Sequence, residues 1–144
     1  AYLGAMLVYW GIKIGLRRRA TRNRGAGMVS LLPSALVSWH FLGCKREGTT
    51  VVTFRLNALT GAVSSEQRHD IFDEAWLPEI KHIPEFAAMR ELSPAYHVVE
   101  ATESPGAVHL TCRDLRTRNF RTRFGELNLV LDREGGVRQI EFHV

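Results

Sequence analysis

The stretch of the 144-residue chain with the most chemical potential is 113–123, which holds five arginines and one acidic residue. Arginines two positions apart on a strand project to the same face of a sheet. Guanidinium groups bind phosphate oxygens through paired, charge-assisted hydrogen bonds. We therefore take this segment as a candidate site for an anionic ligand. Its candidate binding residues are Arg113, Asp114, Arg116, Arg118, Arg121 and Arg123.

The same arginines have a second interpretation, as charged side chains that keep a sheet edge from aggregating. Some could also pair with Glu126, Asp132 or Glu141 on neighbouring strands. Phe120 between the arginines could stack on a nucleobase. Beside a membrane, each basic residue gains about 1 kcal/mol from anionic lipid. Lipid headgroups are therefore the more natural partner of the segment, and nucleic acid is the less favoured alternative.

The six histidines form no recognisable metal motif. His69 and Asp70 are the one adjacent pair that could bind a metal, with Asp73 and Glu74 nearby. We favour a simpler interpretation of this group, as a solvated loop or a helix start with Asp70 as its cap. The chain also lacks a nucleophile elbow, a phosphate loop and a dinucleotide fingerprint. We therefore assign no catalytic residue, metal ligand or cofactor to it.

The formal net charge of +4 is concentrated at one end of the chain. Six of the 19 basic residues precede residue 25, and all 15 acidic residues follow it, the first being Glu47. Residues 25–144 thus carry 13 basic and 15 acidic side chains, a net charge of −2. The high isoelectric point is therefore a poor argument for nucleic-acid binding.

Residues 1–24 predict a helix at or in a membrane. Residues 1–16 carry one charge, Lys13, and include the interface-seeking pair Tyr9 and Trp10. Five arginines follow within eight residues, as is typical of a cytoplasmic flank. The segment has no initiating Met or charged leader, so we expect it to be the last part of a transmembrane helix. An interfacial helix and a helix packed on the domain are the alternatives.

The two cysteines, Cys44 and Cys112, make neither a zinc motif nor a disulfide framework. We expect small buried side chains in a reducing compartment. A single disulfide between them is left open.

The remaining residues predict one domain over 28–144. Alternation of apolar and polar residues predicts strands at 37–41, 52–56, 96–101, 108–112, 127–131 and 140–144, with a short one near Val63. Polar turns are expected at 45–48 and 132–136, and helices at 71–80 and 84–92. The sum is an α+β domain. It has an antiparallel sheet of five or six strands, one or two helices inserted mid-chain, and an apolar helix before it.

Short motifs occur at residues 112–116 (CRDLR), Phe124 and 129–132 (LVLD), preceded by 32–34 (LPS), Val37 and Trp39. Together they resemble the closing segment of the bacterial membrane-bound metal-dependent hydrolase family. The resemblance implies a membrane protein whose N-terminal part holds a histidine-based divalent-metal site. The motifs of that part do not occur in this chain, so no catalytic residue is carried over. This chain would be the cytosolic, C-terminal, non-catalytic domain, at the cell membrane and with homo-oligomer formation as one role.

Overall fold

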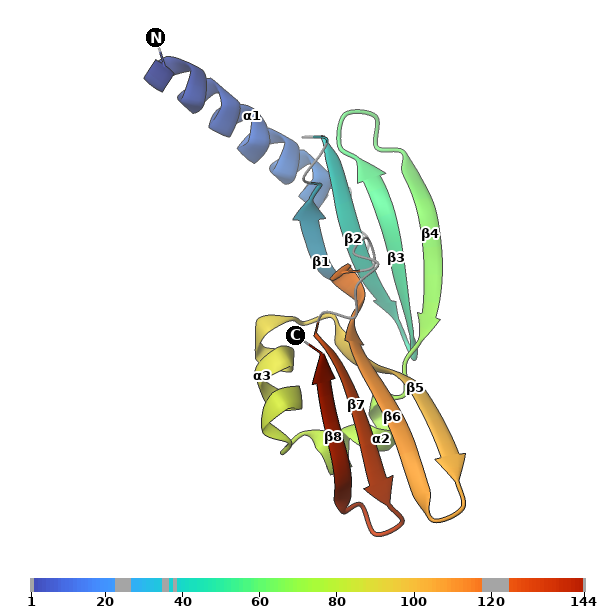
Figure 1. The fold of residues 1–144 in the computed structure, drawn as a ribbon. Coiled ribbons are helices and arrows are strands. Elements are labelled where there is room, and N and C mark those ends of the chain that lie inside the picture. Colours follow the sequence, from blue (N-terminus) through green and yellow to red (C-terminus); the bar gives the residue numbers. More distant parts are fainter. Residues whose placement is uncertain (1, 23–26, 35–36, 38, 118–124, 144) are drawn as a thin grey trace.

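The computed structural model describes residues 2–22, 27–34, 37, 39–117 and 125–143 (Figure 1). The helices are α1 (Tyr2–Arg22), α2 (Asp73–Ile80) and α3 (Pro84–Leu92), with a short 3-10 turn η1 (Leu115–Thr117). The strands are β1 (Met28–Pro33), β2 (His40–Glu47), β3 (Thr50–Asn57), β4 (Val63–Asp70), β5 (Tyr96–Ser104), β6 (Ala107–Asp114), β7 (Glu126–Asp132) and β8 (Val137–His143).

The strands form two antiparallel sheets of four, ordered β1-β2-β3-β4 and β5-β6-β7-β8. Within each sheet, strands that follow one another in the sequence pair with each other. Helices α2 and α3 connect the two sheets and lie beside the second one (Figure 1). The α+β class, the antiparallel pairing, the two mid-chain helices and the N-terminal helix are confirmed. The prediction of one sheet of five or six strands is wrong.

The error has a physical source in β1 and β4. Strand β4 is exposed along nearly its whole length, so its sequence VSSEQRHD has no apolar side to produce alternation. Strand β1 has the sequence MVSLLP, in which adjacent leucines and a proline hide the period of two. Both are edge strands, where pairing on one side alone suffices to form the strand. Neither pattern distinguishes such a strand from a loop.

The first hairpin is displaced from its predicted position. The turn expected at 45–48 belongs largely to strand β2, which pairs with β3 as far as Glu47 opposite Thr50. Gly48 takes the turn with a φ of +64°, a conformation that glycine adopts without steric cost. The strand expected at 37–41 begins only at His40.

The larger core lies between the second sheet and the two helices. Strands β6 and β7 alternate as predicted, with Val108, Leu110, Cys112, Leu127, Leu129 and Leu131 buried on one face. Ile80, Ile83 and Phe86 cover that face from the helical segment. The ring of Phe86 lies 5.7 Å from that of Tyr96, whose hydroxyl donates to the Gly125 carbonyl at 2.9 Å. This sheet and its helices are thus fixed by packing.

Two smaller clusters complete the interior. The last turn of α1 packs on the first sheet, where Leu16 and Ala20 contact a group that includes Phe41 and Phe54. A second cluster lies where the two sheets meet and consists of Cys44, Val51, Ile71, Ala95 and Leu115. Cys44 and Cys112 belong to different clusters and form no disulfide, which settles the alternative left open by the sequence.

Candidate functional site

The predicted arginine segment is only partly within the described residues. Arg118, Arg121 and Arg123 lie outside them. Arg113 is the penultimate residue of strand β6, and its Nε donates to Oε2 of Glu126 at 2.6 Å. The Glu126 side chain is almost fully buried, so this guanidinium compensates a buried charge. The pairing with Glu126 is one of those that the sequence suggested.

The Arg116 side chain is also paired with a carboxylate of the same chain, that of Asp114. It lies on η1 and not on a strand, so it does not extend a stripe along the sheet. Its Nε and Nη2 donate to Oδ2 of Asp114 at 3.0 and 2.7 Å, and Nη2 also donates to the Leu92 carbonyl at 3.3 Å. Asp114 is buried and caps the turn by accepting from the Arg116 backbone N–H. The two described arginines therefore stabilise the end of β6.

His69 and Asp70 are separated by the geometry of strand β4. Neighbouring residues on a strand point to opposite faces, which prevents both from binding one ion. The Nε2 atom of His69 lies 3.2 Å from the Thr53 hydroxyl, and Asp70 accepts from the Thr50 hydroxyl at 3.1 Å. Among the described residues, no three histidine, cysteine or acidic side chains are grouped to hold a metal ion.

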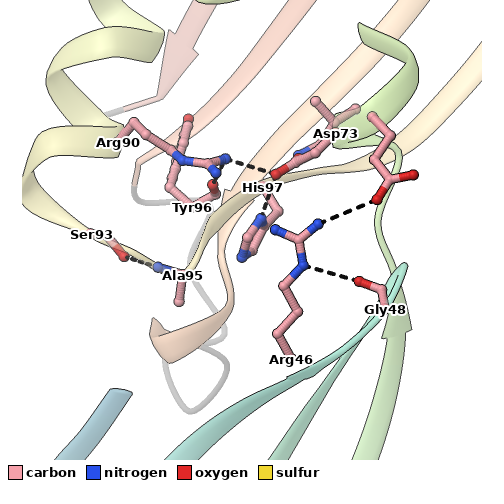
Figure 2. A network of polar contacts seen from close by, with 10 residues as sticks. Arg46, Gly48, Asp73, Arg90, Ser93, Ala95, Tyr96 and His97 are labelled. Atoms are coloured by element: carbon pink, nitrogen blue, oxygen red, sulfur yellow. Dashed lines mark hydrogen bonds and ion pairs between the residues drawn. The ribbon is translucent and has the colours of Figure 1, made fainter. Parts of the chain in front are cut away.

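The most developed polar site is centred on Asp73, the first residue of α2 (Figure 2). Its Oδ2 accepts from Arg90 Nη1 on α3 at 2.8 Å and from His97 Nδ1 on β5 at 2.7 Å. Its Oδ1 accepts from the backbone N–H of Val98 at 2.9 Å. Arg90 Nη1 also donates to the Tyr96 carbonyl at 2.9 Å. One carboxylate thus joins three elements.

The electrostatics of this site keep Asp73 ionised. Burial alone raises the pKa of a carboxyl, but hydrogen bonds from His97, Arg90 and Val98 outweigh it and lower the pKa of Asp73 to about 2. An ionised carboxylate only accepts, so Nδ1 of His97 carries the proton. The Nε2 atom of His97 is buried and has no hydrogen-bond partner within the described part of the chain.

The hydrogen-bond network around Asp73 holds structural elements together and is not an assembled catalytic centre. An Asp–His pair becomes a general base when the far nitrogen of the histidine reaches a nucleophile or a substrate proton. His97 is almost fully buried, and no described hydroxyl or thiol bonds its Nε2. The network instead fixes the first residue of α2, the last turn of α3 and the start of β5.

Sequence reasoning noted Asp73 only as a neighbour of the His69–Asp70 pair and missed the network. Its members lie on three elements, and the outermost, Asp73 and Val98, are 25 positions apart in the sequence. Their spacing follows no periodic pattern, because the contacts arise from the packing of α2 and α3. A polar residue at a helix start and a histidine within the apolar start of strand β5 (YHVV) were the available signals.

A second polar contact links the first sheet to helix α2. Arg46 on β2 donates from Nε to the Gly48 carbonyl at 3.0 Å, and its Nη2 lies 3.7 Å from Oε1 of Glu74 (Figure 2). Next to it is an open hollow of about 250 Å³ whose lining includes Asp73, Lys81 and Arg90. Glu74 is mostly exposed, so this ion pair is weak.

Helix α1 differs from the rest of the chain in what it exposes. It projects from the first sheet along most of its length (Figure 1). Its first thirteen residues expose the large apolar side chains Tyr2, Leu3, Met6, Leu7, Val8, Tyr9, Trp10, Ile12 and Ile14. These side chains lie on every side of the helix, whereas an interfacial helix has one apolar face. Water is a poor environment for such a surface.

The prediction that residues 1–24 contain a helix is confirmed over Tyr2–Arg22. Of the helices in the described ranges, none is long and apolar enough to cross a bilayer by itself. No protein-family model, no curated protein and no solved structure matches this chain.

Proposed function

We propose that the chain is the cytosolic, non-catalytic C-terminal domain of an integral-membrane metal-dependent hydrolase, and that α1 holds it at the cell membrane. One observation carries the membrane part of this proposal. Nine large apolar side chains of α1 are exposed on all sides of the helix, and hydrocarbon is the environment that accommodates such a surface.

The dimensions and charge of α1 support insertion with the domain on the cytoplasmic side. Residues 2–16 form an apolar stretch of about 22 Å at the helical rise, against about 30 Å for a bilayer core. This stretch therefore accounts for part of a span. Arg17, Arg18, Arg19 and Arg22 follow it directly, at the end that meets the domain. Arginines in that position favour the cytoplasmic face.

The hydrolase part rests on the resemblance of the short motifs. The metal and the reaction would belong to the N-terminal part of such a protein, and this domain would stabilise it or bring copies together. The buried ties of Arg113 to Glu126 and of Arg116 to Asp114 fit a scaffold, since they use arginines to hold β6 rather than to meet a ligand.

Flotation of the full chain with phosphatidylcholine vesicles tests the membrane part. We expect the native chain to float and Leu7→Asp to lose about a hundredfold in partition, because an aspartate within a membrane helix costs about 3 kcal/mol. Leu92→Asp is the matched control, since Leu92 is as exposed as Leu7 but lies on α3. A native chain that stays in the aqueous fraction, or equal partition of the two variants, contradicts the proposal.

The reading frame that encodes the chain tests the hydrolase part separately. We expect it to specify further apolar segments of about 20 residues, with clustered histidines, ahead of this domain. A frame without such segments contradicts the hydrolase assignment and leaves the membrane test unaffected.

A further inference from the structure

Two segments without a charged side chain meet at one end of the first sheet. Residues 25–44 and 56–65 contain no aspartate, glutamate, lysine or arginine, although 24% of the whole chain is charged. The start of β2 pairs with the end of β3, and the backbone N–H of Ala58 donates to the Trp39 carbonyl at 2.8 Å. The two segments therefore lie side by side, and we call this part of the sheet the uncharged end.

Large apolar side chains are exposed at the uncharged end. Trp39 is 44% exposed and Leu59 is 47% exposed, and Leu32 and Val63 are exposed as well. They are half of the large apolar residues that the described part of the chain exposes outside α1. A single exposed apolar side chain is ordinary, but a group of them on charge-free segments marks a contact surface.

Helix α1 is attached to the first sheet at the same end. Its last turns pack, through Leu16 and Ala20, on a cluster that includes Phe41, Leu56 and Ala58, and these three residues belong to the uncharged segments. From there α1 projects away from the rest of the molecule (Figure 1). The exposed apolar surface of α1 and the uncharged end are therefore neighbouring parts of one surface.

The opposite end of the molecule is charged. The turn between β7 and β8, which lies at the other end from α1, contains Asp132, Arg133 and Glu134 (Figure 1). A hollow of about 540 Å³ beside this turn is also lined by Glu79 and Glu103. Charged groups lose free energy when they leave water. The two ends of the molecule therefore suit different environments, and only the end that carries α1 suits an apolar one.

We propose that the uncharged end lies on the surface of the lipid bilayer that α1 enters, with Trp39 and Leu59 among the headgroups. The inference rests on the proposed membrane function and adds a second contact, which the sheet itself makes. Tryptophan favours this region because its ring is apolar while its N–H can still donate a hydrogen bond. Contact through both α1 and the sheet fixes the orientation of the domain, so that its charged end points into the water.

Fluorescent labels at the two ends of the molecule test this orientation. The full chain with Leu59→Cys or Val137→Cys is labelled with the fluorophore NBD and bound to phosphatidylcholine vesicles that carry a nitroxide near the headgroups. Val137 is the matched control, because it is 38% exposed at the charged end, where it follows the turn between β7 and β8. Cys44 and Cys112 are buried, so the label reacts with the introduced thiol. We expect the nitroxide to quench most of the fluorescence at position 59 and none at position 137.

Flotation of the same labelled samples separates this inference from the proposed function. A chain that floats while the label at position 59 stays unquenched keeps its membrane anchor and overturns the contact of the sheet. Equal quenching at the two positions overturns it as well, because neither end is then preferred. A label at position 59 that is shielded from iodide in the water but not quenched from the lipid indicates a protein partner on the uncharged end, and also overturns the proposal. A chain that stays in the aqueous fraction contradicts the proposed function and this inference together.

Discussion

The Nδ1 atom of His97 lies 2.7 Å from Oδ2 of Asp73, and both side chains are almost fully buried. The same oxygen accepts a hydrogen bond from Arg90. One carboxylate on α2 therefore binds side chains from both α3 and β5. This relationship explains how two short helices, each of fewer than ten residues, keep a fixed position against the second sheet. Helices of that length gain their stability from tertiary contacts and not from propensity.

Replacement of Asp73 by asparagine should lower the free energy of unfolding by about 2–4 kcal/mol. The change removes the charge that compensates Arg90 and leaves partners in the interior with imperfect hydrogen bonds. Urea unfolding followed by circular dichroism measures the loss. Glu74→Gln is the control, because Glu74 is the next residue on α2 and its side chain is 73% exposed. A loss of the same size in both variants contradicts the role assigned to the buried network.

Low pH should destabilise the protein because it protonates the Asp73 carboxylate. The pKa of Asp73 is about 2 in the folded chain and 3.8 for an unperturbed aspartate. Because the folded pKa is the lower one, the stabilisation is complete above pH 4 and is lost as the pH falls toward 2. The shift corresponds to about 2–3 kcal/mol. Urea midpoints between pH 5 and pH 2 should fall more steeply for the native chain than for Asp73→Asn, and parallel slopes argue against Asp73 as the group responsible.

The sequence predicts those parts of the fold that bury one face regularly. Strands β6 and β7 were recognisable because Leu110 and Leu129 each belong to an alternating apolar set. Strand β4 was predicted only as a short strand near Val63, because it contributes little to any core and keeps its pairing through backbone hydrogen bonds with β3. The division into two sheets depended on recognising that strand, so the number of sheets was wrong although the class was right.

The same distinction applies to the polar contacts. A pair on neighbouring strands could be predicted from the sequence, and a contact that depends on helix packing could not. The pairing of Arg113 with Glu126 was among the alternatives that the sequence suggested, because cross-strand neighbours can be guessed from a hairpin. The tie between Asp73 and His97 was not, because it depends on where α2 packs after the chain leaves the first sheet. Local sequence patterns do not show where α2 packs.

Phe86→Ala should cost about 3–5 kcal/mol of stability, the usual range for loss of a buried aromatic ring. Phe86 is 1% exposed and lies on the ring of Tyr96, so its removal opens a cavity that the sheet cannot close. Leu92→Ala on the same helix removes a side chain that is 73% exposed and should change stability by less than about 0.5 kcal/mol. Thermal unfolding of the two variants compares them, and similar transition temperatures contradict the placement of α3.

Cys112 should resist thiol reagents in the folded protein. It is 0% exposed in the core between β6 and the helices, and burial raises its pKa to about 12. Only the thiolate reacts readily, and at neutral pH that form is almost absent in such a site. In a Cys44→Ala variant, which leaves Cys112 as the single thiol, we expect reaction with a chromogenic disulfide reagent only after addition of denaturant. Rapid reaction of the native variant, at a rate independent of unfolding, contradicts the buried position of strand β6.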